Sequence, residues 1–459
     1  MIAIAEVRVA RKAAFHHAQQ SGGRTARCGK IRGTWPERKA HLVAASSVPR
    51  MRAGEVRLAL LIIRRKCSAN TSSSSSNIFN DTFSEIFSTE SDSASSSEYP
   101  ADDILFPLYQ LLMHGKRRTK VQGFLDTVHS YSDSVFKEHF RLQRRTAYLN
   151  IDMLQQSDFI PSHSCGMPKI SAEWSFLIFL WYLANTEPLR TLGDRFDVSI
   201  SSIFRVIRRV VEWLLSRMDE EIKWPEGNDA ILITSQKFEA NRGIKKCIGA
   251  IDCTHITIRQ SVDYPRDYCN RKRYFSIVLQ AVVDADMKFT NIYCGEPGSL
   301  HDARVLRRSL LYATAEDDME SIFPNETCII GDSAYPLLPW LVPPFKDNGH
   351  LTVQQSEFNF SHNSTRIPVE RAFGYLKGRF RRLKFLELLD IQFIPKLITA
   401  ACIMHNIAIK ENDENDEFFV DDIDLNNAAD YEINNLQGNR NRNQIDRRMQ
   451  MFRELFNPE

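Results

Sequence analysis

The spacing of hydrophobic residues changes near residue 245. Before it, apolar positions repeat with helical spacing through residues 135–230 and include a mostly apolar stretch, EWSFLIFLWYLAN, at 173–185. An apolar helical pattern also begins near residue 103. After residue 245 the apolar runs are shorter and have the character of strands. The pattern predicts an all-helical region over 101–230, followed by an α/β domain over 245–410.

A helix-turn-helix is predicted over about 187–217. A short helix ends at a turn formed by Asp197 and Val198, and Ser199 is a suitable N-cap for the long helix that follows. The apolar stripe of the long helix leaves three arginines facing elsewhere, namely Arg205, Arg208 and Arg209. A helix-turn-helix with a basic second helix can contact DNA. An ordinary helical hairpin with a solvated basic face would show the same pattern.

The domain over 245–410 has the predicted order β-β-β-α-β-loop-α-α. Its predicted elements are a strand at 246–258, two antiparallel strands within 274–298, a helix at 301–314, a short strand at 327–337, a loop at 339–364, a basic helix at 365–384 and a buried helix at 397–409.

Three acidic residues stand where these elements could gather them. Asp252 lies inside an apolar strand, where a carboxylate is costly unless it is compensated, and Asp332 ends the fourth strand. If these strands are neighbours, the two aspartates lie side by side, and a helix crossing that edge could deliver Glu370. Clustered carboxylates need a cation, and hard oxygen ligands favour Mg²⁺ or Mn²⁺. The hypothesis is a metal site for in-line phosphoryl chemistry on nucleic acid, with the three acids as catalytic ligands.

Each acid also has a structural explanation. Asp252 could pair with a lysine such as Lys246, and Asp332 could be a turn residue in Gly-Asp-Ser. Glu370 could be a favourable charge in the first turn of its helix. It is the joint arrangement of the three that favours the catalytic hypothesis.

Further candidates lie around these acids. His301 and Asp302 follow a Pro-Gly turn, and Asp302 could cap the next helix or add a carboxylate near the metal. His255 is expected to be a hydrogen-bonded structural residue. The basic segment, TRIPVERAFGYLKGRFRRLK at 365–384, carries seven Lys and Arg and one acid. Three of its cations are predicted to share the face of Glu370 and to follow a DNA backbone, although a solvated basic ridge remains an alternative: Lys377, Arg381 and Lys384.

Composition adds three points. The net charge is only +2, but residues 1–66 carry fifteen Lys and Arg against three acids, which suits local phosphate contact. The nine cysteines show no CxxC pair, which favours a reducing compartment over a disulfide framework or a zinc site. The apolar run at 58–63 is too short to span a membrane.

The two ends of the chain are predicted to lie outside the folded domains. Residues 1–100 are basic and then Ser-rich, a composition that predicts disorder, and their opening weakly resembles a transit peptide. Residues 411–459 are predicted to form an acidic and then polar tail with a short helix.

Six motifs in order resemble the PIF/Harbinger-type DDE transposases and the nucleases derived from them. They are GAIDCTHITI, YFSIVLQAVVDAD, GEPGSLHDARVLRRS, GDSAYPLLPWLVPPF, RIPVERAFGYLKGRF and ACIMHNI, and the resemblance covers roughly 135–410. It implies an RNase H-like catalytic domain, a mixed sheet flanked by helices, preceded by a helix-turn-helix. It also implies divalent metal at Asp252, Asp332 and Glu370.

The resemblance further implies DNA as substrate, a Myb-like partner protein and a location in the nucleus, with the cytoplasm as a second location. Oligomers are compatible with it. The chain departs from the family pattern at Cys253 and Ala334, where glycine is usual, and neither change removes a carboxylate. The rival hypothesis is a domesticated, non-catalytic DNA-binding or adaptor protein that acts through the helix-turn-helix. The sequence leaves open the target DNA, the oligomeric state and whether the gene is an active transposon.

Overall fold

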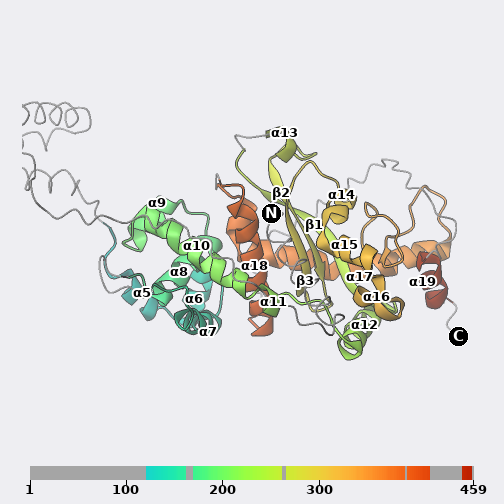
Figure 1. The fold of residues 1–459 in the computed structure, drawn as a ribbon, viewed down its shortest axis with the longest axis horizontal. Coiled ribbons are helices and arrows are strands. Elements are labelled where there is room, and N and C mark those ends of the chain that lie inside the picture. Colours follow the sequence, from blue (N-terminus) through green and yellow to red (C-terminus); the bar gives the residue numbers. More distant parts are fainter. Residues whose placement is uncertain (1–119, 162–168, 261–264, 388–389, 414–446, 457–459) are drawn as a thin grey trace, which may run out of the picture. The chain divides into compact units, whose positions relative to one another are not determined.

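The computed structural model describes residues 120–161, 169–260, 265–387, 390–413 and 447–456. The predictions made for 1–100, for the apolar pattern near 103 and for the acidic stretch after 413 fall outside these residues. Figure 1 labels the helices and strands of the described part.

The helical region packs around one apolar helix, α8 (Ala172–Ala184), whose residues are almost all buried. The pattern of 135–154 forms two helices, because Arg141 takes a left-handed conformation (φ 61°) and ends the first of them. The other helices before the sheet are α5 (Phe124–Ser130), α6 (Asp133–Phe140), α7 (Arg144–Gln155), α9 (Leu189–Arg195), α10 (Ile200–Ser216), α11 (Met218–Glu221) and α12 (Asn228–Arg242).

Helices α9 and α10 have nearly the predicted bounds, and their turn has the predicted cap. The Ser199 hydroxyl accepts a hydrogen bond from the backbone N–H of Ser202, which satisfies one of the donors left open at the start of a helix. The apolar stripe of α10 is buried: Ile203, Val206, Ile207, Val210, Val211, Trp213 and Leu214. These helices form the hairpin expected from the sequence, a geometry that alone does not distinguish a DNA-binding motif from a structural one.

The second part is built on a mixed five-stranded sheet with the order β3-β2-β1-β4-β5. Figure 1 labels its strands β1, β2 and β3. The β1 strand is antiparallel to β2 and parallel to β4, and β5 is parallel to β4. This arrangement agrees with the predicted mixed sheet flanked by helices. The strands are β1 (Cys247–Thr257), β2 (Ser276–Val283), β3 (Phe289–Pro297), β4 (Cys328–Ile330) and β5 (Leu341–Val342).

Helices cover both faces of the sheet. One face packs on α17 (Val353–Arg379) and α18 (Phe393–Lys410) in a core that continues into the helical region. The other face packs in a separate cluster on the helices that follow β3, which are α14 (Asp302–Arg308), α15 (Leu310–Asp317) and α16 (Met319–Ile322). The sheet, which carries Asp252, therefore lies between two helical layers, and Glu370 and Asp302 belong to those layers.

Two predictions of secondary structure in this domain, one of a loop and one of a helix, are wrong. The segment 339–364 was predicted to be a loop, but it contains β5 and the first turns of α17, which starts with a capping box formed by Thr352 and Gln355. The helix predicted at 301–314 is two helices, because Ser309 ends α14 and its hydroxyl caps α15. The short connecting elements are α13 (Pro265–Tyr268), η1 (Pro324–Glu326) and η2 (Arg381–Lys384).

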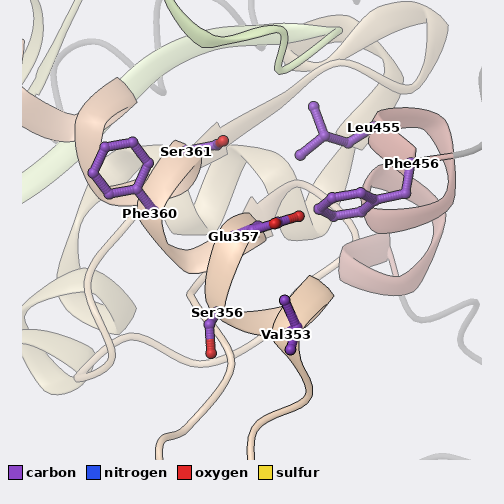
Figure 2. Close-up of a pocket in the computed structure, with 7 residues that line it drawn as sticks. All are labelled: Val353, Ser356, Glu357, Phe360, Ser361, Leu455 and Phe456. Atoms are coloured by element: carbon purple, nitrogen blue, oxygen red, sulfur yellow. The ribbon is translucent and has the colours of Figure 1, made fainter.

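The described part of the tail is a helix, α19 (Arg447–Phe456), that packs near the start of α17. Phe452 of α19 contacts the rings of Phe345 and Phe358. A cavity opens between these two helices, and Figure 2 shows the residues that line it: Val353, Ser356, Glu357, Phe360, Ser361, Leu455 and Phe456. None of these lining residues is a candidate site residue. The cavity and the acidic site therefore occupy different places.

In the described part of the chain, one helix, α18, is long and apolar enough to cross a membrane. However, 78% of its apolar window is buried inside the fold. Its His405 and Asn406 also form hydrogen bonds to backbone groups of the β2–β3 connection and β3. These features are typical of a core helix.

Candidate active site

Asp252 and Asp332 lie at the same edge of the sheet. In the parallel pair of β1 and β4, Ala250 is opposite Ile330, and each aspartate lies two residues beyond that pair. The chain between Ile330 and Asp332 needs a glycine, because a Cβ on Gly331 would lie 2.9 Å from the Tyr335 ring and 3.0 Å from the Ile251 side chain. The first and fourth strands are neighbours, and their pairing places Asp252 and Asp332 at the same edge of the sheet.

The two aspartates make few hydrogen bonds with their oxygens. The backbone N–H of Ala334 donates to Asp332 Oδ1 at 3.0 Å, as expected for a turn residue, while the buried Oδ2 has no hydrogen-bond partner. The backbone N–H of Cys253 donates to Asp252 Oδ1 at 2.7 Å. Lys246 does not pair with Asp252, since its ammonium contacts Glu326 at 2.8 Å. A buried carboxylate oxygen without a donor is costly, and a bound cation would compensate it.

Asp302 is the third acid at this edge. Burial raises the pKa of Asp252 to about 7, Arg366 opposes that rise, and the carboxylates of Asp332 and Asp302 add to it. Burial, followed by the charge of Asp332, raises the pKa of Asp302 to about 6. The structure therefore brings three aspartates into one electrostatic cluster. Their repulsion is the property that favours cation binding.

Glu370 reaches this cluster through an arginine. One guanidinium nitrogen of Arg366 donates to Asp252 Oδ2 at 3.0 Å and to Glu370 Oε1 at 3.3 Å. The Arg366 side chain is 10% exposed, whereas that of Glu370 is 57% exposed. Glu370 lies well inside α17 rather than in its first turn, so both the prediction that it opens the helix and the helix-dipole explanation are wrong.

Over the described ranges, no three His, Cys, Asp or Glu side chains are arranged so that they could hold a metal ion. A guanidinium group, which is itself a cation, lies between Asp252 and Glu370. The donor set still fits a hard divalent ion, because it consists of carboxylates and one oxygen of Asp332 has no partner. Asp252 and Asp332 lie just beyond the paired residues of β1 and β4, with Asp302 close enough to act on the pKa of Asp252.

The basic segment 365–384 uses most of its cations inside the fold. The Lys377 ammonium donates to Thr254 Oγ1 at 2.7 Å and to the carbonyl oxygen of His255 at 3.0 Å, which fixes it on β1 beside the acids. The prediction that Arg381 and Lys384 extend the ridge of Glu370 is wrong, because α17 ends at Arg379 and both lie in η2. The apolar residues of the segment that pack into the core are Val369, Phe373, Leu376, Phe380 and Leu383.

The arginines of α10 also differ in exposure. Arg205 is exposed, while Arg208 forms an ion pair with Asp390 and lies over the rings of Phe204 and Phe393. Arg209 is partly buried, and this burial, together with the charge of Arg205, lowers its pKa. Of the three, Arg205 has the geometry of a side chain open to a partner.

The sequence reasoning missed two features of the site. Arg366 was part of the basic segment but was not singled out, although its position four residues before Glu370 places both on one helix face. Arg271 was also missed, and one of its guanidinium nitrogens lies 2.7 Å from Nδ1 of His301, directly before Asp302. The structure also places the two histidines that the sequence singled out. His255 Nδ1 is hydrogen-bonded to Ser276 Oγ at 3.0 Å, and His301 lies next to the cluster on an exposed position.

The sheet, its flanking helices and the acids define the class to which residues 251–406 belong. A family model described as DDE superfamily endonuclease matches these residues, which include Asp252, Asp332 and Glu370. The match runs from β1 into α18 and so spans the whole sheet.

Proteins with similar sequences indicate which group within this superfamily the chain resembles. The chain is 32% identical to "Protein ALP1-like" of Arabidopsis thaliana over 302 residues, which cover 62% of this chain and 73% of that protein. It is 27% identical to "Putative nuclease HARBI1" of Bos taurus over 307 residues, which cover 65% of this chain and 84% of that protein. The chain belongs to the Harbinger-type transposases and transposase-derived nucleases of the DDE endonuclease superfamily. No solved structure matches it.

Proposed function

We propose that this chain is a metal-dependent DNA endonuclease or transposase of the Harbinger type, which hydrolyses or transfers DNA phosphodiester bonds. The observation that carries the proposal is the cluster of three buried or partly buried aspartates at the β1–β4 edge, with one Asp332 oxygen lacking a partner. Asp252, Asp332 and Glu370 would hold Mg²⁺ or Mn²⁺, and Asp302 would stand beside them. A divalent ion bound there would activate water or a DNA 3′-hydroxyl and stabilise the leaving oxygen.

The side chains of this chain would prepare the site for that chemistry. Arg366 holds Asp252 and Glu370 on one guanidinium and so limits the directions that their carboxylates take. The hydroxyl oxygen of the buried Tyr335 lies 3.2 Å from the Cys253 sulfur, and its ring lies close to Gly331, the residue before Asp332. Lys377 fixes α17 to β1, which keeps the helix that carries Glu370 against the strand that carries Asp252.

The test is cleavage of DNA that carries terminal inverted repeats, with Mg²⁺ or Mn²⁺. Asp332→Asn keeps the hydrogen bond from Ala334 possible but removes the charge, so we expect cleavage to fall at least about a hundredfold. Asp317→Asn is the matched control, because Asp317 is an exposed aspartate at the end of α15. Equal cutting by a folded Asp332→Asn protein would remove this site from the proposal.

DNA contact outside the acids is part of the same proposal. Among the cations suggested by the sequence, Arg205 and Arg381 are exposed and best placed to reach a DNA backbone. Arg208, Arg209, Lys377 and Lys384 are partly buried and would contribute less. A nuclear location and a Myb-like partner accompany the proposal through family resemblance, and imaging of the tagged protein with and without that partner tests both.

A second function, DNA binding or adaptor activity without catalysis, is favoured by one observation. Arg366 occupies the space between Asp252 and Glu370, and no three described donors are arranged for a metal. This function would act through α9 and α10. Retention of DNA at moderate salt, with no nicking and no heat of Mn²⁺ binding in calorimetry, would support it over the nuclease.

A further inference from the structure

The loop that connects β1 to β2 contains a tight basic turn, residues 270–274, which we call the cationic turn. Its sequence, NRKRY, places three consecutive cations at its tip, and all three are exposed: Arg271, Lys272 and Arg273.

The cationic turn has a fixed shape. The backbone N–H of Asn270 donates to the Tyr274 carbonyl at 3.0 Å, and that of Arg273 donates to the Asn270 carbonyl at 3.0 Å. The buried Asn270 side chain accepts from the Tyr274 N–H at 3.2 Å and donates to Ser276 Oγ at 3.2 Å. The cations are therefore presented by an ordered turn, which lowers the entropy lost when a ligand binds.

The turn is held beside the acids through a close contact of two loops. The N–H of Gly298 donates to the Ser276 carbonyl at 2.9 Å, and that of Ser299 donates to the Asp267 carbonyl at 3.2 Å. A Cβ on Gly298 would lie 2.1 Å from Ser276 Oγ and 2.9 Å from its carbonyl oxygen, so only glycine allows this approach. The loop from Gly298 leads directly to His301 and Asp302. Residues 265–274 are thereby placed next to the aspartate cluster.

Arg271 is the member of the turn nearest to the acids. Its guanidinium lies 2.7 Å from His301 Nδ1, and its positive charge acts on Asp302, where it lowers the pKa against the larger effect of burial. Within the described residues, no carboxylate forms an ion pair with Arg271. The contact with the His301 ring therefore orients the guanidinium without pairing it with a negative charge.

We propose that Arg271, oriented by His301 and assisted by Lys272, binds a phosphate group of the DNA strand that enters the acidic site. A guanidinium offers paired donors that match a phosphate, and consecutive exposed cations on a fixed turn suit a polyanionic backbone. An anionic strand needs cations at the rim of a site lined by carboxylates, because the acids alone repel it. This inference rests on the proposed function, since it assumes that the site receives DNA.

Metal-free DNA binding tests the inference separately from catalysis. The affinity for a fluorescein-labelled duplex of arbitrary sequence is measured by anisotropy in EDTA over a range of salt concentrations. We expect Arg271→Ala to weaken binding several-fold and to reduce the slope of log K against log[salt] by about one, with a larger change in Arg271→Ala/Lys272→Ala. Arg271→Lys should recover part of the affinity.

Arg453→Ala is the matched control, because Arg453 is an exposed arginine on α19, away from the turn. Affinity and salt slope in this variant should equal those of the wild type. The inference is overturned if Arg271→Ala behaves like Arg453→Ala, or if the wild type binds no duplex at low salt. A wild type that binds DNA through Arg271 but never cuts it would contradict the proposed nuclease function and leave this inference supported.

Discussion

The basic segment 365–384 and the cationic turn lie beside the same acids but differ in how far their positive charges are exposed. In the basic segment, Arg366 contacts Asp252 and Glu370, Lys377 is bonded to β1, and Arg379 and Arg382 are buried at 1% and 3% exposure. In the turn, all three cations are exposed. A run of Lys and Arg in a sequence therefore indicates a phosphate-binding surface only if its cations are not already engaged by other residues of the fold.

The buried arginines of the basic segment join it to the helical region. Arg379 donates to the carbonyl oxygens of Arg141 and Asp413, both at 2.8 Å, and forms an ion pair with the Asp413 carboxylate at 3.4 Å. Arg382 donates to the carbonyl oxygen of Tyr182 at 3.2 Å and lies over its ring. These charges are structural, and their removal should affect folding before it affects DNA.

The largest expected effect comes from Arg379→Met. It leaves the buried Asp413 carboxylate without its arginine, so the free energy of unfolding should fall by about 3–5 kcal/mol. Arg271→Met is the matched change in the cationic turn and should alter stability by less than about 0.5 kcal/mol. Urea unfolding followed by circular dichroism measures both. Similar losses in the two variants would break the comparison between the segments.

Acidic pH should lower the stability of the fold through His405, which is buried close to Arg379. The pKa of His405 is lowered from 6.5 to about 4. Burial is the main cause and the charge of Arg379 contributes, while the hydrogen bond to the Met287 carbonyl opposes the shift. The unfolded chain binds a proton at this histidine that the folded chain does not, so stability should be lost as the pH falls from about 6.5 to about 4.

The expected size for His405 is on the order of 3 kcal/mol across that range. Chemical unfolding of the wild type and of His405→Gln at several pH values measures it. The variant should show a shallower fall in stability below pH 6.5 than the wild type. An identical pH dependence in the two proteins would show that His405 is not buried in its neutral form.

Lys377→Met should have an intermediate effect. Its partly buried ammonium makes two hydrogen bonds to β1, so we expect a loss of about 1–2 kcal/mol of stability. The salt slope of DNA binding should stay unchanged, because this charge is already engaged by the protein. A slope reduced by about one would instead assign Lys377 to the DNA surface, together with Arg271.

The smallest expected effect on stability comes from Arg273→Gly, a change that acts on the backbone of the cationic turn. Arg273 has a left-handed conformation (φ 61°), which glycine adopts without strain. Arg273→Gly should therefore change the melting temperature only slightly, with relief of strain and greater freedom of the unfolded chain acting in opposite directions. A large loss of stability would mean that the Arg273 side chain, and not the turn geometry, holds the loop.

The local pattern of apolar and capping residues was sufficient to predict much of the secondary structure. The positions of β1, β2 and β3 follow from their apolar runs, and Ser199 marks the start of α10 because capping depends on residues close in sequence. It failed at the start of α17, where the polar sequence NFSHNST resembles a loop although Phe358, His362 and Thr365 are buried in the helix. It failed also at β5, whose two residues are defined only by their pairing with β4.

The sequence by itself determined the candidate site residues: Asp252 within an apolar strand, Asp332 after another, and six ordered motifs of the DDE family. Only the tertiary structure decided how they are arranged. It paired β1 with β4, added Asp302 to the two aspartates, inserted Arg366 between Asp252 and Glu370, and separated structural cations from exposed ones. The physical reason is that burial and ion pairing depend on residues distant in the chain, whereas periodicity and capping act over a few neighbours.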